Sequence, residues 1–454
     1  MDKIKAFFRN KWVGFTIWTL LYILWFVVWT GNLWLLIGVA IIYDIYFTRY
    51  LYRWLWRYNE ELCKKSSAYK FIYEWVNAII FATVVASLIH IFFFQMYVIP
   101  TSSMEKSLLV GDYLYVSKAA YGPKMPNTPI AFPFVHHTMP FSTTKKSFSE
   151  VIKWPYHRLT GFGNVKRGDA VVFNFPAGDT VLLEQQNVTY YDVLRSYEER
   201  YGVKEGRRRL FSDYTVISRP VDKREHYIKR CIALPGDTLQ IIDSDIYIDS
   251  KLMPAIPGRE LFHIVETTKP ISEYAFERLN ITEYDYNRNA GVYYMALTDE
   301  AADALRKMNN VVAVRPYKEQ DGSGAVYPHD KSLGWNADNY GPIWIPCKGA
   351  TIEFTAENMQ LYKRAIEVYE GNQVETTEDG RVLINGVESK EYTFKQDYYW
   401  MMGDNRHNSA DSRFWGFVPE DHVVGKASFV WLSLDPNKSF PSNIRWSRMF
   451  RSVK

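Results

Sequence analysis

The chain carries the run YIKRCIALPGD at residues 227–237. Its β-branched and aromatic residues predict a strand, and the Pro-Gly-Asp ending predicts a turn directly after it. Lys229 therefore lies inside an apolar strand, whereas most lysines are solvated surface groups. Burial among apolar groups disfavours the ammonium form and lowers a lysine pKa from its usual value of about 10.4 toward neutrality. A lysine in this setting can act as a general base.

A serine suited to this base lies in the run PTSSM at residues 100–104, five residues past a long apolar run. A serine hydroxyl is a poor nucleophile at neutral pH and needs a group that takes its proton. The nine histidines fall in places without triad character, and the sequence has no Gly-x-Ser-x-Gly turn. The sequence therefore favours a Ser–Lys hydrolase.

Three other stretches complete a pattern. They are GD at 111–112, RGD at 167–169 and GDNRHNSADSR at 403–413. Together with residues 100–104 and 227–237, they resemble the motifs of the bacterial type I signal (leader) peptidases. These are Ser–Lys serine proteases that cut signal peptides from exported preproteins.

The resemblance covers roughly residues 97–250 and 395–450, and it implies a role for each matching residue. The serine motif puts the nucleophile at Ser103, and the lysine motif makes Lys229 the general base. The oxyanion hole would consist of the Ser103 backbone N–H and the Thr101 hydroxyl. Both would donate to the oxygen that becomes negative in the tetrahedral intermediate.

The same resemblance implies roles for residues around this pair. Ser409 would hydrogen-bond the Lys229 amine and orient it, while Asp411 and Arg413 would form a supporting ion pair close by. The residues that match the walls of the small substrate pockets are Ile99, Leu108 and Ile228. No metal and no cofactor is implied.

The chain departs from the family pattern after the serine, where Glu105-Lys106 stands in place of x-Pro. His407 also occupies a position where an acid is common. The first change creates the pattern Ser-x-x-Lys between Ser103 and Lys106, which is typical of penicillin-binding proteins and β-lactamases. Those enzymes also need Lys-Thr-Gly, which this sequence lacks, so that interpretation is disfavoured.

Three apolar runs, at 13–29, 33–47 and 75–94, predict membrane-spanning helices. The turn residues 30–32 separate the first two into a hairpin. No small-x-small cleavage site follows the first run, so we expect it to remain as an anchor and not to be removed as a signal peptide.

Basic residues predict the orientation of these helices. They occur before the first run and between the second and third, whereas the turn at 30–32 has none. The residues are Lys3, Lys5, Arg9, Lys11, Arg49, Arg53, Arg57, Lys64, Lys65 and Lys70. We therefore expect a multi-pass protein of the cell (inner or plasma) membrane, with a cytoplasmic N-terminus and residues 96–454 on the periplasmic side.

Beyond the membrane segments, short runs of β-branched and aromatic residues predict a mainly β catalytic body of antiparallel sheets. Helices are expected at 190–201, 299–308 and 356–369, each after a threonine N-cap. The expected divisions are a tail and hairpin at 1–48, a basic loop at 49–74, a third helix at 75–95, the first part of the catalytic domain at 96–251, an α+β insertion at 252–394 and the second part at 395–454.

Composition agrees with a membrane-anchored protein whose larger part is in water. The mean hydropathy is −0.24, and 17% of the residues are aromatic, as suits amphipathic rings at bilayer interfaces. A net charge of +4 is too weak to argue for nucleic acid. Three cysteines do not make a disulfide framework, and whether Cys231 and Cys347 form a bridge is open.

A proline-rich aromatic loop at 121–165 with several basic residues is suited either to an anionic membrane surface or to packing on the β body.

The expected activity is that of a membrane-bound signal peptidase, a serine endopeptidase acting at Ala-x-Ala sites through an acyl-enzyme. Its expected partners are exported preproteins, the lipid bilayer and, functionally, the translocation machinery. Two alternatives are disfavoured. A self-cleaving repressor-like protease would need a DNA-binding segment in place of three membrane spans, and a catalytically idle binding module would be expected to have lost one of the five site residues. An endoplasmic reticulum-type enzyme would carry histidine at Lys229.

Overall fold

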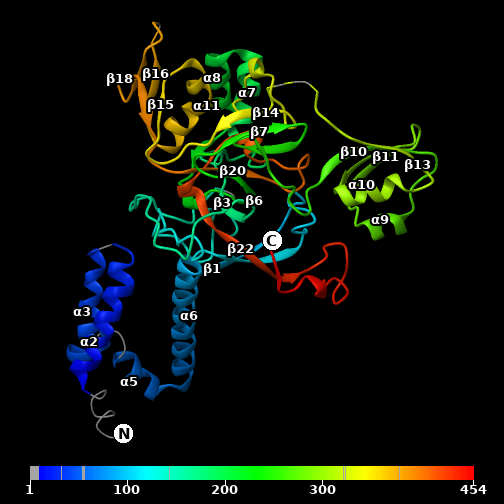
Figure 1. Ribbon diagram of the computed structural model, residues 1–454. Coiled ribbons are helices and arrows are strands. Elements are labelled where there is room, and N and C mark those ends of the chain that lie inside the picture. The colour runs from blue at the N-terminus through cyan, green and yellow to red at the C-terminus, as the bar shows by residue number, and fades with distance from the viewer. Residues whose placement is uncertain are drawn as a thin grey trace.

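The computed structural model describes residues 10–31, 33–53, 57–142, 144–320, 322, 324–377 and 379–453. The basic residues Lys3, Lys5 and Arg9 lie outside this part of the chain. Figure 1 shows a β body at the end of one long helix, α6, with a pair of apolar helices beside that helix. A smaller α+β unit lies on the flank of the body.

Among the residues that the structure describes, two helices are long and apolar enough to cross a membrane. They are α6 (Ser67–Phe92) and the segment Lys11–Val28, which begins as α2 (Lys11–Tyr22) and continues as a π-helix (Ile23–Val28). No residue of α6 is buried, and an apolar surface of this size marks a contact with lipid or protein. The first and third predicted spans are therefore confirmed as long apolar helices. The third starts at Ser67 because the Ser66 side chain caps it by accepting from the Tyr69 N–H.

The second predicted span is shorter than expected. Its apolar helix covers Ile37–Thr48, made of α3 (Ile37–Tyr43) and a π-helix (Asp44–Thr48), after a 3₁₀ turn at Leu33–Leu36. Twelve residues of helix are fewer than the roughly 17 that a full span needs. The hairpin of two complete spans thus stays a prediction. Two further helices, α4 (Tyr50–Tyr52) and α5 (Tyr58–Lys65), lead into α6.

The main sheet collects strands from both ends of the body. Its order is β1 (Phe94–Val98), β2 (Asp112–Ser117), β22 (Val423–Ser433), β3 (Ala170–Asn174), β6 (His226–Ala233), β20 (Tyr398–Met402) and β21 (Val418–Pro419), and β23 (Arg451–Ser452) pairs with β22. Neighbours in this sheet are antiparallel, as predicted for the catalytic body. The sheet places the serine, lysine and C-terminal motifs within one layer.

A second sheet and several small ones cover the far side of the body. The second sheet has the order β14 (Tyr340–Trp344), β7 (Thr238–Ile242), β8 (Asp245–Ile248), β9 (Lys251–Leu252). The small sheets pair β15 (Thr351–Glu353) with β19 (Glu391–Thr393), β4 (Thr180–Leu182) with β5 (Val216–Ser218), and β17 (Val382–Ile384) with β16 (Val374–Thr376) and β18 (Val387–Ser389). The largest core cluster joins the two main sheets and includes Ile232, Tyr340 and Trp400.

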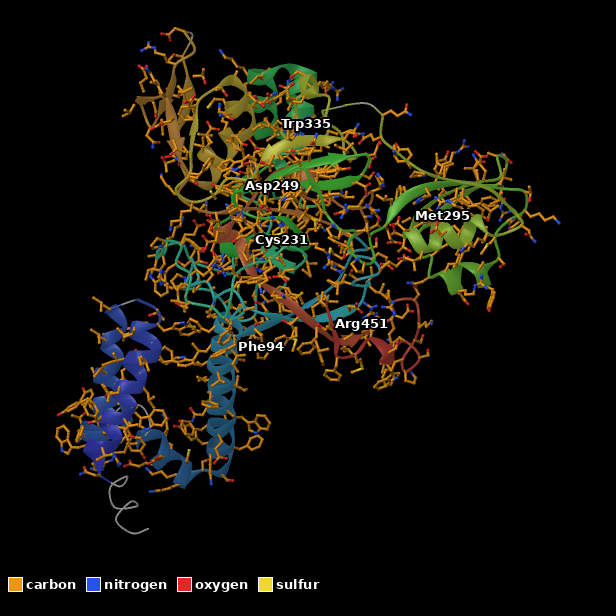
Figure 2. All side chains as sticks on the ribbon, viewed as in Figure 1. Phe94, Cys231, Asp249, Met295, Trp335 and Arg451 are labelled. Atoms are coloured by element: carbon orange, nitrogen blue, oxygen red, sulfur yellow. The ribbon has the colours of Figure 1, made fainter. Side chains whose placement is uncertain are left out.

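The flanking unit has its own sheet and core. Its strands are β11 (Tyr284–Asn287), β12 (Val292–Leu297), β10 (Leu261–Thr267) and β13 (Val311–Pro316), covered by α9 (Glu273–Leu279) and α10 (Asp299–Arg306). Val265, Met295 and Leu305 pack in its interior, and Figure 2 labels Met295 there. The region 252–394 is thus divided, because β14 pairs with β7 of the body (Ile343 opposite Leu239).

The three helices predicted beyond the membrane segments are present as α7 (Tyr190–Tyr201), α10 and α11 (Ala356–Arg364). Within the described residues, α8 (Val203–Asp213), α9 and α12 (Ser412–Trp415) were not expected. Thr189, Thr298 and Thr355 cap α7, α10 and α11 with their side chains, as predicted. The three cysteines are free, so Cys231 and Cys347 are not bridged.

Candidate active site

Ser103 lies in a turn that follows the first strand of the main sheet. After β1, the Ile99 N–H donates to Asp112 O at 2.9 Å and Gly111 N–H returns a bond to Ile99 O at 3.0 Å, which fixes the two ends of the loop. The loop between them turns inward, and Ser103 is only 8% exposed. A hydroxyl held in a short buried turn keeps its geometry.

Lys229 reaches this serine from β6. It stands opposite Val171 in the antiparallel pair with β3 and is 3% exposed. Its Nζ donates to Ser103 Oγ at 2.5 Å. Two residues separated by 126 positions thus form one buried contact, as the sequence motifs predicted.

Burial changes the protonation of this lysine. Desolvation lowers the pKa of Lys229 from 10.5 to about 8, against the opposing effect of the carboxylates Asp411 and Asp404. Arg413 assists the lowering by charge repulsion. A substantial fraction of the amine is therefore neutral near physiological pH, when it can accept a proton.

The motif at residues 403–413 packs directly against the serine turn. Asn405 N–H donates to Ser103 O at 3.2 Å. A Cβ on Gly403 would lie 2.3 Å from Ser409 Oγ and 2.5 Å from Ser103 O. This close approach of two backbones requires glycine at position 403.

Asp411 and Arg413 form the predicted ion pair in a fully buried position. Arg413 Nε donates to Asp411 Oδ1 at 2.9 Å and Nη2 donates to Oδ2 at 2.8 Å. Asp411 also accepts from Gly403 N–H at 3.1 Å and caps α12. Arg413 in turn binds the Arg406 carbonyl. The pair therefore ties both ends of the 403–413 loop together, which a bidentate geometry does with defined orientation.

Ser409 differs from expectation in its contacts. Its Oγ is buried and has no hydrogen-bond partner among the described residues, so the predicted bond to the Lys229 amine is absent from this structure. The side chain instead lies against Gly403. The bond between Ser409 and Lys229 was expected from the sequence motif. A motif indicates which residues lie close together, but it does not determine the direction in which a serine hydroxyl points.

The substrate-pocket residues share one apolar cluster with the turn. Ile99, Leu108 and Met104 are buried in it, and Ile228 packs against it from β6. Leu108 is 0% exposed and Ile99 3%, so neither presents an open surface in this conformation. Their placement beside the serine agrees with the sequence, while their pocket function stays a prediction.

The two expected oxyanion donors are available. Neither the Ser103 backbone N–H nor the Thr101 hydroxyl donates to another group within the described residues. Thr101 is exposed, whereas Ser103 is buried. No group of three or more His, Cys, Asp or Glu side chains suited to a metal ion occurs in that part of the chain.

Sequence reasoning missed a second buried ion pair next to the lysine. Arg230 Nε and Nη2 donate to Asp404 at 2.7 and 2.6 Å, and both side chains are 1% exposed. Arg230 also donates to Ser107 Oγ at 3.1 Å, in the loop that carries Ser103. Arg230 lies in the motif at 227–237 and Asp404 in the motif at 403–413. Their place in two motifs that meet at the site was the sequence feature that could have predicted the pair.

The two departures from the family pattern have structural explanations. Lys106 has a φ of +68°, which proline, fixed near −65°, cannot adopt. Its Nζ instead donates to Asn280 O at 2.5 Å and lies 3.2 Å from Glu260 Oε1, so it contacts the flanking unit and the segment entering it. His407 Nε2 lies 2.9 Å from Asp338 Oδ1, and its Nδ1 accepts from Phe262 N–H at 3.0 Å.

Comparison with known proteins agrees with this geometry. The model of the family described as signal peptidase, peptidase S26, matches residues 72–296 and 345–432. Signal peptidase I of Haemophilus influenzae is 24% identical over 84% of this chain and 76% of that protein. Signal peptidase I of Helicobacter pylori is 24% identical over 85% of this chain and 93% of that protein. With more than half of its length matched by the family model, the chain belongs to the signal peptidase family, peptidase S26, and is a serine peptidase.

Proposed function

We propose that the protein is a membrane-bound signal peptidase I. It would remove N-terminal signal peptides from exported preproteins at Ala-x-Ala-type sites, using Ser103 and Lys229 as a catalytic dyad. The observation that carries the proposal is the 2.5 Å contact between Lys229 Nζ and Ser103 Oγ, in a buried position that lowers the pKa of the lysine to about 8.

The chemistry follows from that contact. Neutral Lys229 takes the hydroxyl proton while Ser103 Oγ attacks the scissile carbonyl carbon. The Ser103 N–H and the Thr101 hydroxyl donate to the oxyanion that forms. The Lys229 ammonium then gives its proton to the departing amine, which leaves an ester on Ser103. Water attacks this ester with Lys229 again as base, and the serine is released with the signal peptide carboxylate.

The surrounding loop would hold the dyad in position. The Asp411–Arg413 pair closes the 403–413 loop under Ser103, and Arg230 joins Asp404 to Ser107. Ser409 is close enough to the serine turn to join the lysine when the site reorganises around a substrate. Such groups would affect the rate by holding geometry, without forming bonds to the substrate.

The substrate would bind as an extended strand beside residues 95–99. Ile99, Leu108 and Ile228 would form the small pockets that select alanine. Because Leu108 and Ile99 are buried in the present conformation, the pocket would open by a local shift of the cluster around Met104.

We further propose a multi-pass arrangement with a cytoplasmic N-terminus and the catalytic body on the periplasmic side. The 49–70 segment, with its six basic residues, lies at the end of α6 remote from the β body (Figure 1). At the opposite end of α6, Trp29 Nε1 donates to Thr160 O at 3.3 Å, so the residue that follows the first apolar helix contacts the β body. This arrangement agrees with basic loops staying inside.

Cleavage of a preprotein with an Ala-x-Ala site tests the proposed activity. We expect Ser103→Ala to abolish cleavage. Ser102→Ala is the matched control, because this neighbouring hydroxyl accepts a bond from Asn408 and makes no contact with Lys229. Cleavage by Ser103→Ala at the wild-type rate would instead favour a catalytically idle site with activity from another source.

A further inference from the structure

A large cavity lies where the long helix joins the β body. Its volume is about 690 Å³, within the range of small-molecule sites. The last turns of α6, the strand β1 and the loop at 126–136 form its walls. His90 of α6 and Phe134 of the loop pack with ring centroids 5.6 Å apart, which closes one side. Figure 1 shows this junction at the base of the body.

The charged groups that line the cavity are mostly cationic. Its lining includes three lysines, which are Lys118, Lys124 and Lys223, and the histidines His90, His136 and His226. Asp222 is the one carboxylate among its described lining residues. The Asp222 Oδ2 atom already accepts from the Thr128 N–H and hydroxyl. The lining therefore has a positive excess that is not balanced within the cavity.

Two of these lysines lack a hydrogen-bond or ion-pair partner within the described residues. The Lys223 Nζ lies over the Phe148 ring, 5.6 Å from its centroid, whereas the Lys118 Nζ makes no ring contact in that part of the chain. By comparison, the Lys124 Nζ donates to Asn174 Oδ1 at 3.3 Å and to Asp421 O at 2.9 Å. Lys118 is half-buried, so an anionic group next to its Nζ would supply the partner that the described residues do not provide.

Burial also changes the protonation of the groups that line the cavity. Burial lowers the pKa of Lys118 to about 7 and that of Lys124 to about 8, and the two cations repel each other. Burial likewise lowers the pKa of His136 and of His226. An anion in the cavity would restore the charge of the lysines, as a counter-ion does at a desolvated site.

The rim of the cavity is apolar. Ile130, Phe132 and Phe134 are each at least half exposed, and α6 is apolar with no buried residue. A ligand that fits must therefore have an anionic group for the interior and hydrocarbon for the rim and the helix.

We propose that this cavity binds the phosphate group of a phospholipid, whose acyl chains lie along α6 and the exposed apolar side chains at 130–134. The inference rests on the proposed membrane crossing of α6 and is independent of the peptidase activity. Lipid binding would also affect the strand next to the proposed active site. Gln95, Met96 and Tyr97 of β1 line the same cavity, so a bound lipid contacts the strand that leads into the Ser103 turn.

Lipid binding by the full chain in detergent micelles tests the proposal. Native mass spectrometry reads the stoichiometry and affinity for dioctanoyl phosphatidylglycerol. Inorganic phosphate is the probe without hydrocarbon, and dioctanoylglycerol is the probe without phosphate. The variant is Lys118→Gln, with Lys118→Arg as the charge-retaining rescue. Lys145→Gln is the matched control, because it removes the same charge from an exposed site in the same loop.

We expect one phospholipid to bind tightly to the wild type and about five-fold more weakly to Lys118→Gln, the effect of one lysine near a lipid phosphate. Lys118→Arg and Lys145→Gln should bind as the wild type does. An equal loss in Lys145→Gln would overturn the site in favour of general surface attraction. Displacement by inorganic phosphate at equal concentration would make free phosphate the ligand, and equal binding of dioctanoylglycerol would exclude recognition of phosphate.

Discussion

At the scale of single residues, the account depends on one buried amine. In the proposed mechanism Lys229 can act as a base because the strand around it excludes water; its Nζ lies 2.5 Å from Ser103 Oγ in the same buried setting. The carboxylates Asp411 and Asp404 oppose this effect by favouring the ammonium form. Their own binding to Arg413 and Arg230 limits that opposition, because each carboxylate is already paired.

The pH dependence of kcat/KM should report this amine. Since burial lowers the pKa of Lys229 from 10.5 to about 8, the neutral fraction grows as pH rises through about 8. Below that pH, kcat/KM should fall roughly ten-fold per unit, because only the neutral amine accepts the serine proton. Steady-state cleavage between pH 6 and 10 measures this. A midpoint near 10.5, or a flat profile, would show that Lys229 is not the base.

Ser409→Ala should separate activity from stability. The hydroxyl has no partner among the described residues, so its removal leaves no unpaired group and should change the free energy of unfolding by less than about 1 kcal/mol. If Ser409 orients Lys229 during turnover, kcat should nevertheless fall by part of the roughly 10²–10⁴-fold range of general-base catalysis, with KM unchanged. A raised KM with unchanged kcat would assign Ser409 to the substrate-binding surface.

At the scale of elements, the flanking unit is attached to the nucleophile loop. Lys106 donates to Asn280 O at 2.5 Å and pairs with Glu260 at 3.2 Å. Glu283 accepts from Asn408 at 3.0 Å. Burial is the main cause that raises the pKa of Glu260 to about 7; Lys106 opposes the rise, and the neighbouring Glu105 and Glu283 contribute to it.

Lys106→Ala should therefore destabilise the protein mainly above pH 7. The stabilising contribution of protonated Glu260 is complete below about 4.5 and is lost as pH rises through about 7. Above that pH the carboxylate needs Lys106, and removing its partner should cost about 1–3 kcal/mol. Thermal unfolding at pH 6 and pH 8.5 measures the difference.

Lys307→Ala, at an exposed position in the same unit, is the control for that measurement. An equal loss at both pH values for Lys106→Ala would mean that Glu260 is not the group responsible. A loss of the same size in the control would mean that the charge of the unit, and not this contact, determines its stability.

Elements were predictable where the signal is local. Thr189, Thr298 and Thr355 each begin a helix at the expected residue, because an N-cap satisfies backbone donors within one turn. The sheet order was not predictable, since β22 pairs with β2 and β3 across some 250 to 320 positions. The division of 252–394 was missed for the same reason, because β14 joins β7 by a long-range pairing that its own residues do not encode.

At the scale of the whole molecule, the sequence predicted which residues meet at the candidate site better than it predicted the ion pairs around them. Ser103 and Lys229 were identified from motifs and meet in the structure, because their contact is what the motifs encode. The partners of Lys106 and the Arg230–Asp404 pair depend on side-chain geometry between distant segments. The length of the second apolar helix also differed, because residues Leu33–Leu36 form a 3₁₀ turn before the helix begins at Ile37.

Thiol labelling tests the orientation of the whole chain. Cys63 lies on α5, in the basic segment that we expect in the cytoplasm. In a Cys347→Ser background, a membrane-impermeant maleimide should label Cys63 only after the membrane is permeabilised. A Lys145→Cys variant should be labelled in intact spheroplasts. Labelling of Cys63 from outside would reverse the proposed orientation.

The acyl-enzyme is the most direct test of the central claim that Ser103 is the nucleophile and Lys229 its base. Full-length protein is mixed with a preprotein peptide, quenched in acid within milliseconds and mapped by mass spectrometry. The account predicts a signal peptide ester on Ser103, present in the wild type and in Ser102→Ala and absent from Ser103→Ala and Lys229→Met. An ester on Ser102, or an ester that forms at the wild-type rate in Lys229→Met, would contradict it.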